Sequence, residues 1–213
     1  MNIGVLIITR GDRPKFLEQA KKMLKEQTLQ PNEICIVNDE PLSKEIDITY
    51  RYRIGFERLK DKVDVIIFWE DDDYYSPKYI ETMFTSWVHN GKPELFGLAQ
   101  TIYYHLGLRA FNIIKHDGRA SAMSTMVSTK LNINFPNDNE PFFDLHLWRN
   151  NKGVTFAPKE ILNIGIKHGI GKCGGKGHLC NFKYNNNDDN MLFLRNHVTE
   201  EFFKFYNEVS SNL

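Results

Sequence analysis

The 213-residue sequence has no surplus of charge of either sign, because 27 Lys and Arg residues balance 27 Asp and Glu residues. Zero net charge argues against bulk electrostatic binding to nucleic acid or to an anionic membrane, although a local basic groove is compatible with it. No apolar run approaches the roughly 20 residues that span a bilayer. The first eight residues also lack the basic region and cleavage site of a signal peptide. We therefore expect neither a membrane span nor a nucleic-acid partner.

Cysteine is scarce as well. The three cysteines, Cys35, Cys173 and Cys180, form an odd set without a CxxC pair. Cys35 lies in an apolar run, which predicts a buried free thiol. A zinc site made by Cys173, Cys180 and His178 lacks a fourth ligand. This usage favours a reducing, cytoplasmic location.

Glycine-rich phosphate loops are missing. No GxGxxG follows the first apolar run, and GxxxxGK[ST] does not occur. Dinucleotide binding and P-loop phosphate binding therefore have no motif support. A bound diphosphate would need positive charge from elsewhere, such as a metal ion held by carboxylates.

The most informative stretch that is present is the apolar run of residues 63–69, which leads straight into four consecutive carboxylates at 70–73. The run predicts a strand buried on both faces. Ser76 and Pro77 then suit the cap and first position of a helix. The carboxylates thus come at the carboxyl end of a central strand, where open α/β sheets bind ligands. A hard cation would relieve their mutual repulsion, and we prefer this interpretation to a solvated acidic turn.

The remaining pattern predicts an α/β fold. Strand, helix and strand within about forty residues at the start indicate a βαβ unit and a sheet that is at least partly parallel. Expected strands are 3–9, 33–37, 63–69, 95–104, 109–115 and 123–128, while 154–157 and 161–166 are either final strands or loop edges. Expected helices are 16–29, 54–59, 77–88, 142–150 and 199–209.

Three segments carry a resemblance to a known family. They read Val-Leu-Ile-Ile-Thr-Arg at 5–10, Ile-Cys-Ile-Val-Asn-Asp at 34–39, and Ile-Ile-Phe-Trp-Glu-Asp-Asp-Asp-Tyr-Tyr-Ser-Pro at 66–77. In this order they resemble the family-2-like, DxD-containing nucleotide-sugar glycosyltransferases of GT-A fold, and the whole chain is similar to chlorella-virus glycosyltransferases of capsid-glycan synthesis. The resemblance implies a mixed, mainly parallel central sheet flanked by helices. It also implies one domain, 1–213, with a nucleotide-binding half (1–90) and an acceptor half (91–213).

The resemblance assigns roles to the polar residues at the strand ends. Asp39 matches the aspartate that contacts the uracil or ribose, and residues 71–73 match the DxD element, although Trp69 and Glu70 depart from the commoner pattern before it. The implied ligands of Mn²⁺ (or Mg²⁺) in this element are Asp71 and Asp73. The implied nucleotide-binding residues of this half are Thr9, Arg13, Asp39, Asp71 and Asp72.

The segment His168-Gly169-Ile170-Gly171-Lys172 resembles the His-x-x-Gly-…-Lys element of several retaining GT-A families. There the histidine is a third metal ligand, while glycine and lysine approach the diphosphate, which here implies His168, Gly171 and Lys172. Imidazole suits Mn²⁺, glycine lets the backbone come close, and lysine is a compact phosphate partner. The shorter spacing leaves Lys176 as a rival of Lys172, and a structural role for His168 stays open.

Asp144 resembles the carboxylate that opens the acceptor-side helix of inverting family-2 enzymes and deprotonates the acceptor hydroxyl. Phe143 stands where those enzymes have a glutamate, and Asp138 and Glu140 are nearby rivals. The alternative is a carboxylate that only serves the helix dipole. The histidine-lysine element indicates retention of configuration and Asp144 indicates inversion, so both outcomes stay open.

Together these features predict a metal-dependent hexosyltransferase. Its donor would be a UDP-sugar of the UDP-glucose or UDP-rhamnose type, and its acceptor a hydroxyl of a glycan or glycoprotein in capsid or surface glycan synthesis. One alternative is a sugar-nucleotide nucleotidyltransferase, for whose phosphate loop residues 10–13 are a poor substitute. The other is a binding module for sugar nucleotides or glycans that has lost the chemistry.

Overall fold

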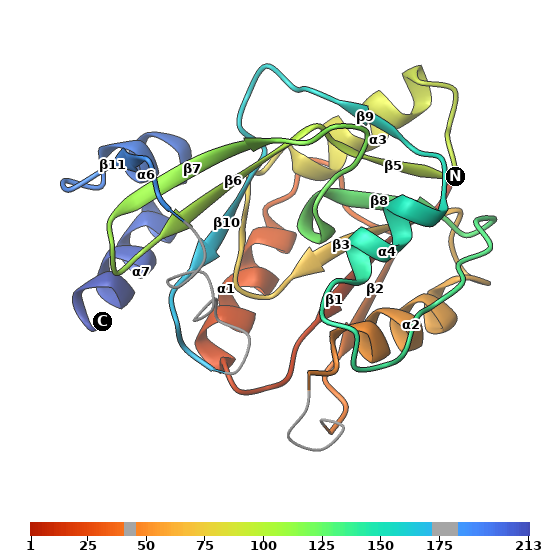
Figure 1. Ribbon diagram of the computed structural model, residues 1–213, viewed down its shortest axis with the longest axis horizontal. Helices are drawn as coiled ribbons and strands as arrows, with labels where there is room; N and C mark the ends of the chain where they lie inside the picture. Colours follow the sequence, from red (N-terminus) through yellow and green to blue (C-terminus); the bar gives the residue numbers. More distant parts are fainter. Residues whose placement is uncertain (41–45, 172–182) are drawn as a thin grey trace.

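A six-stranded mixed sheet forms the centre of the computed structural model, which describes residues 1–40, 46–171 and 183–213 (Figure 1). The strand order is β2-β1-β3-β8-β5-β9. Strand β1 is parallel to β2 and β3, β5 is parallel to β9, and β8 runs antiparallel to β3 and β5. The bounds are β1 Ile3–Ile8, β2 Glu33–Val37, β3 Val65–Glu70, β5 Leu95–Leu98, β8 Thr125–Ser128 and β9 Val154–Phe156.

A second sheet of five strands has the order β11-β7-β6-β10-β4. Strand β4 follows β3 after the acidic turn, and β10 pairs with β4 on one side and with β6 on the other. This pairing brings the end of β10, and the loop that follows it, beside the turn. The bounds are β4 Tyr74–Tyr75, β6 Gln100–His105, β7 Ala110–Lys115, β10 Asn163–Lys167 and β11 Asn186–Asn187.

Helices cover both faces of the central sheet (Figure 1). The alternation of side chains along β1 divides the core: Val5 and Ile7 belong to the cluster with α1, α3 and α7, whereas Leu6 and Ile8 belong to the cluster with α2 and α4. The bounds are α1 Pro14–Lys25, α2 Ile48–Leu59, α3 Tyr79–His89, α4 Phe143–Asn150, α6 Leu192–His197 and α7 Glu200–Ser211, with a 3-10 turn η1 at Ala122–Ser124.

An aromatic stack anchors the end of β3. The ring of Trp69 is fully buried and lies on that of Tyr75, with 3.8 Å between centroids. The hydroxyl oxygen of Tyr75 accepts a hydrogen bond of 2.9 Å from the backbone N–H of Glu70. The backbone of the last residue of β3 is therefore held by a side chain of β4.

Several expected boundaries are wrong: α1 ends at Lys25 rather than at Leu29, and α2 begins at Ile48 rather than at Ile54. At two further places, distant strands take up the residues. Tyr74 and Tyr75 form β4, and the backbone N–H of Ser76 donates to the carbonyl of Leu162 at 2.8 Å. Helix α3 therefore begins at Tyr79 rather than at Pro77, and Ser76 does not cap it. The expected strand 95–104 is divided at Ala99 into β5 and β6, which belong to different sheets.

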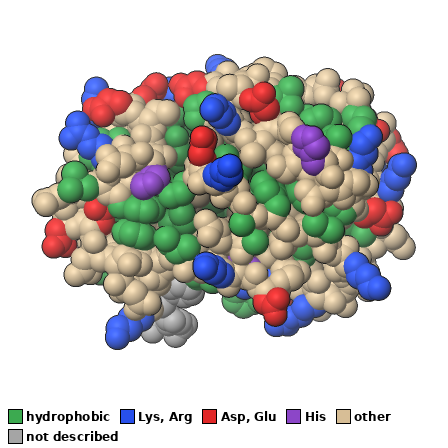
Figure 2. All heavy atoms as spheres, turned by 90° about the horizontal axis from the view of Figure 1, so that it is seen from above, with side chains coloured by type: hydrophobic (Ala, Val, Ile, Leu, Met, Phe, Trp, Pro, Cys, Tyr) green, Lys and Arg blue, Asp and Glu red, His purple; other side chains and the backbone are tan. Residues whose placement is uncertain are grey.

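Cys35 differs from its expected burial. It is half-buried, because β2 is the edge strand of the central sheet and has only one neighbour. Among the described helices, none combines the length and the apolar character needed to cross a bilayer. On the face shown in Figure 2, basic and acidic side chains are interspersed.

Candidate active site

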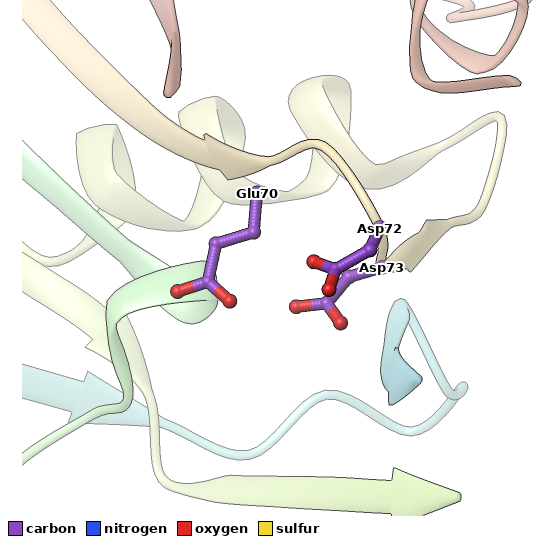
Figure 3. Close-up of side chains that lie close together, drawn as sticks. All are labelled: Glu70, Asp72 and Asp73. Atoms are coloured by element: carbon purple, nitrogen blue, oxygen red, sulfur yellow. The ribbon is translucent and has the colours of Figure 1, made fainter. Parts of the chain in front are cut away.

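The carboxylates of residues 70–73 are gathered at the carboxyl end of β3. Glu70 is the last residue of the strand, and the three aspartates that follow it are buried in the turn before β4. Oxygens of Glu70, Asp72 and Asp73 lie within 4.8 Å of one another, and Figure 3 shows these three carboxylates converging. Buried like charges at such distances repel strongly unless a cation lies among them.

Asp73 has one satisfied and one unsatisfied carboxylate oxygen. Its Oδ1 accepts a hydrogen bond of 2.8 Å from the backbone N–H of Ile166, whereas its buried Oδ2 has no hydrogen-bond partner among the described residues. Burial, together with the charges of Glu70 and Asp72, raises the pKa of Asp73 well above its usual value, although Lys167 acts against this. An orphaned buried oxygen inside an acidic cluster fits a cation ligand.

Arg13 binds two of the aspartates from the turn between β1 and α1. Its Nη2 lies 2.6 Å from Oδ1 of Asp71, and its Nη1 bonds Oδ2 of Asp72. Burial acts to raise the pKa of Asp72, but Arg13 and the hydrogen bond from His168 hold it well below its usual value. Burial and the neighbouring Asp72 raise the pKa of Asp71 to about 7, against the influence of Arg13.

His168 is enclosed at the same place. Its ring stacks on Phe16 with 4.1 Å between centroids, and its Nε2 lies 3.0 Å from Oδ2 of Asp72. Its Nδ1 accepts the backbone N–H of Ile170 at 3.0 Å, so a neutral ring carries its proton on Nε2 and donates it to Asp72. As a metal ligand through Nε2, His168 would have to carry that proton on Nδ1, and Ile170 would have to move.

Gly171 lies against the same β1–α1 turn. Its φ of +70° favours glycine, and a Cβ at this position would come 2.8 Å from Oδ2 of Asp12 and 3.1 Å from Cγ of Arg13. Gly171 is therefore packed on Arg13, the residue that pairs with the aspartates. Lys172 and its rival Lys176 lie outside the described residues.

A small cavity of about 70 Å³ opens at the ends of β1 and β3. Asp47 is buried beside it and pairs with Arg10 and Arg51. The Arg51 side chain also donates to the backbone carbonyls of Val37 and Asp39. Four of the residues assigned to the nucleotide line this cavity: Thr9, Arg13, Asp71 and Asp72.

The side chain of Asp39 does not line this cavity. Both of its oxygens bind Arg58, at 2.9 and 3.0 Å, and the side chain is 36% exposed. Contact of this carboxylate with a base or ribose would require the pair to open. Solvent-exposed ion pairs contribute little to stability, so opening this one costs little.

A second cavity, of about 260 Å³, lies on the other side of Glu70 and is also lined by Asp144, Tyr103 and Lys167. Asp144 is in the first turn of α4. Burial raises the pKa of Asp144, while the backbone N–H of Leu145 and the guanidinium of Arg119, 3.9 Å away, act in the opposite direction. The turn at the end of β3 and the start of α4 thus meet at one cavity, although they are far apart in sequence.

The two rivals of Asp144 have other partners. Asp138 pairs with Arg53 at 2.8 Å, and a carboxylate oxygen of Glu140 accepts the backbone N–H of Phe142. Sequence reasoning assigned no ligand role to Glu70 and no role to Lys167. Lys167 ends an apolar strand, as the acidic residues do. The same sequence signal that predicted a site at the aspartates could therefore have pointed to Lys167.

This chain is similar to known proteins in its structure. No protein-family model and no curated protein matches the sequence. Residues 1–349 of S. aureus TarS in complex with UDP-GlcNAc superpose with a TM-score of 0.59 and 10% identity, over 83% of this chain and 61% of that one. The same protein in complex with UDP gives 0.55 and 12%, over 78% and 60%.

The chain has the GT-A fold. The fold predicted from the resemblance is thereby confirmed, and the chain spans about 60% of the length of these TarS structures. A glycosyltransferase involved in glycosylation of the major capsid of PBCV-1 is also similar, with 12% identity over 78% of this chain and 94% of that one. Its TM-score is 0.45, which is too low to support an argument.

Proposed function

We propose that this protein is a metal-dependent glycosyltransferase that moves a hexose or deoxyhexose from a UDP-sugar to a glycan or glycoprotein hydroxyl. The observation that carries the proposal is the carboxylate cluster at the end of β3, with the orphaned Oδ2 of Asp73. The UDP-GlcNAc and UDP in the similar TarS structures support a nucleotide-sugar donor. We extend the proposal to donors of the UDP-glucose or UDP-rhamnose type and to capsid or surface glycan synthesis.

The charges around the turn fit a divalent cation. Four carboxylates at 70–73 face two permanent cations, Arg13 and Lys167, which leaves an excess of negative charge in a buried place. Asp73, Asp72 and Glu70 have the oxygens closest together, so we propose these as the holders of Mn²⁺ or Mg²⁺. The cation, when bound, would neutralise the diphosphate and stabilise it as a leaving group. Asp71 and His168 remain candidates only if they leave Arg13 and Asp72.

We place the nucleotide half of the donor at the mouth of the cavity at the ends of β1 and β3. Thr9 and Arg13 lie there, so a hydroxyl and a guanidinium are available to the ribose and phosphate oxygens. The sugar would then extend past Glu70 into the second cavity, toward Asp144. In this arrangement the half 1–90 supplies the nucleoside side of the donor site, and the half 91–213 supplies the acceptor side.

Asp144 is the candidate general base. Its carboxylate would take the proton of the acceptor hydroxyl while that oxygen bonds to the anomeric carbon, and the bond from this carbon to UDP breaks. A base on the side of the sugar away from the diphosphate favours inversion. The pKa raised by burial suits a carboxylate that must accept a proton.

Release of UDP from a panel of UDP-sugars, with and without Mn²⁺, tests the proposal directly. We expect slow Mn²⁺-dependent hydrolysis of one donor even without an acceptor. Binding of UDP without release from any sugar, in the presence of glycan acceptors, would favour a binding module. Pyrophosphate-dependent turnover would favour a nucleotidyltransferase.

A further inference from the structure

Lys167 is a buried ammonium group that has no close polar partner in the part of the chain that the structure describes. It ends β10 and is 8% exposed. Within residues 1–40, 46–171 and 183–213, its Nζ makes no hydrogen bond and has no carboxylate oxygen within 4.0 Å. Its Nζ lies over the ring of Tyr103, 5.1 Å from the ring centroid. A buried cation in this condition is costly unless an anion can reach it.

Lys167 lines the cavity that Glu70 and Asp144 share. The carboxylates of Asp73, Asp72 and Glu70 act on its charge from beyond hydrogen-bond distance. The side chain therefore borders a space of about 260 Å³, which is large enough for a ligand. The space also borders the turn proposed to hold the cation.

The neighbouring carboxylates limit what the anion can be. Glu70 and Asp144 would repel a free anion from this cavity. An anion that arrives with a divalent cation avoids that repulsion, because the cation takes up the charge of Glu70, Asp72 and Asp73. The same event withdraws these carboxylates from Lys167 and leaves its ammonium group available for a phosphate oxygen.

We propose that Lys167 binds the diphosphate of the metal-bound donor, at the phosphate farther from the nucleoside. This inference rests on the proposed function, and it assigns a position to each phosphate. The nucleoside side of the site is at Thr9 and Arg13, and Lys167 lies in the cavity on the other side of Glu70. It follows that the metal and the distal phosphate strengthen each other's binding.

The test is calorimetry on Lys167→Met and on Lys130→Met as the matched control. Lys130 is an exposed lysine that follows β8, at the opposite end of β3 from the acids, since Ser128 pairs with Val65. With saturating Mn²⁺, we expect Lys167→Met to weaken UDP binding by at least about tenfold, the loss of one charged hydrogen bond. UMP and uridine should bind within about twofold of the wild type, and Lys130→Met should leave all three affinities unchanged.

Two further measurements separate this role from a structural one. Mn²⁺ alone should bind Lys167→Met at least as tightly as the wild type, because a competing cation is gone, and Lys167→Arg should recover part of the UDP affinity. Should Lys167→Met not fold, Lys167→Gln takes its place with the same expectations. Equal UDP affinity in variant and wild type, or equal weakening of UDP, UMP and uridine, would overturn the inference. Failure of the wild type to bind UDP with Mn²⁺ would instead remove the proposed function, and this inference with it.

Discussion

His168 and Asp72 are joined by a buried hydrogen bond of 3.0 Å between residues 96 positions apart in the sequence. The backbone N–H of Ile170 on the other ring nitrogen fixes which nitrogen donates. The imidazole therefore orients one carboxylate of the acidic turn. Residues that hydrogen-bond to metal ligands orient those ligands in the same way. This arrangement links the loop after β10 to the end of β3 before any ligand binds.

Replacement of His168 by Ala should lower the free energy of unfolding. The variant loses a hydrogen bond to a charged group and the stack on Phe16, and together these predict a loss of about 2–3 kcal/mol. Denaturant titration of the ligand-free protein measures it. His89→Ala, at the exposed end of α3, is the control and should stay within about 0.5 kcal/mol of the wild type. Unchanged stability in His168→Ala would mean that the ring is not held as described.

Asp73→Asn should have opposite effects with and without metal. The amide oxygen can still accept the N–H of Ile166, and the change removes an ionisable group whose burial beside Glu70 and Asp72 is costly. We expect the variant to unfold at a higher temperature than the wild type in EDTA at neutral pH, by a few degrees. It should also lose Mn²⁺-dependent UDP binding. The exposed Asp61→Asn serves as the control, and retained Mn²⁺ dependence in Asp73→Asn would rule out Asp73 as a ligand.

Gly171→Ala and Gly118→Ala form a matched pair. Both glycines have positive φ, +70° and +64°, but only a Cβ at Gly171 would meet neighbours, Asp12 and Arg13. Gly118→Ala should cost about 1 kcal/mol for backbone conformation alone. Gly171→Ala should cost more and should also weaken UDP binding, because Arg13 must shift. Equal losses of stability with unchanged UDP affinity would show that the loop adapts without disturbing Arg13.

Asp144→Asn should affect turnover and not donor binding. If Asp144 is the general base, kcat should fall by about 10²–10⁴-fold while the affinity for UDP with Mn²⁺ stays the same. Asp138→Asn, which loses only the surface pair with Arg53, should keep turnover near that of the wild type. A reversed ranking of the two variants would assign the base to Asp138.

Stability should decrease at acid pH through His116. Burial, with the nearby charge of Arg119, lowers the pKa of His116 from 6.5 to about 4. The unfolded chain therefore takes up a proton at a higher pH than the folded chain, so stability is lost as the pH falls from about 6.5 toward 4. For this half-buried group we expect about 1–2 kcal/mol. His116→Asn should flatten that part of the pH profile, and an unaltered slope would contradict the assignment.

The local sequence pattern was sufficient to predict the part of the fold that holds the acidic turn. The apolar runs that form β1 and β3 are long, β-branched and sharply ended, and this is enough to place residues 70–73 at a strand end. The sequence reasoning also placed Asp144 near the start of its helix, because an aspartate before an apolar helical pattern is a local signal.

Long-range pairing determines what the sequence could not predict. Tyr74 and Tyr75 look like the approach to a helix, but they form a strand because β10 is there to pair with them. The role proposed for Lys167 depends on the carboxylates of the acidic turn, which only the fold brings near it. The partner of Asp39 is likewise a residue of another element, Arg58, and a strand-end pattern contains no information about it.

The stack of Trp69 on Tyr75 gives the molecule an internal optical reporter. Trp69 directly precedes Glu70 in the chain. The buried N–H of its indole has no hydrogen-bond partner among the described residues. The other two tryptophans, Trp87 and Trp148, donate their N–H groups to Pro93 and Thr125 on other elements. In a background with Trp87→Phe and Trp148→Phe, the remaining emission would come from one ring beside the acidic turn, and a change of charge there would shift its wavelength. The protein thus carries a label for occupancy of its own site without any chemical modification.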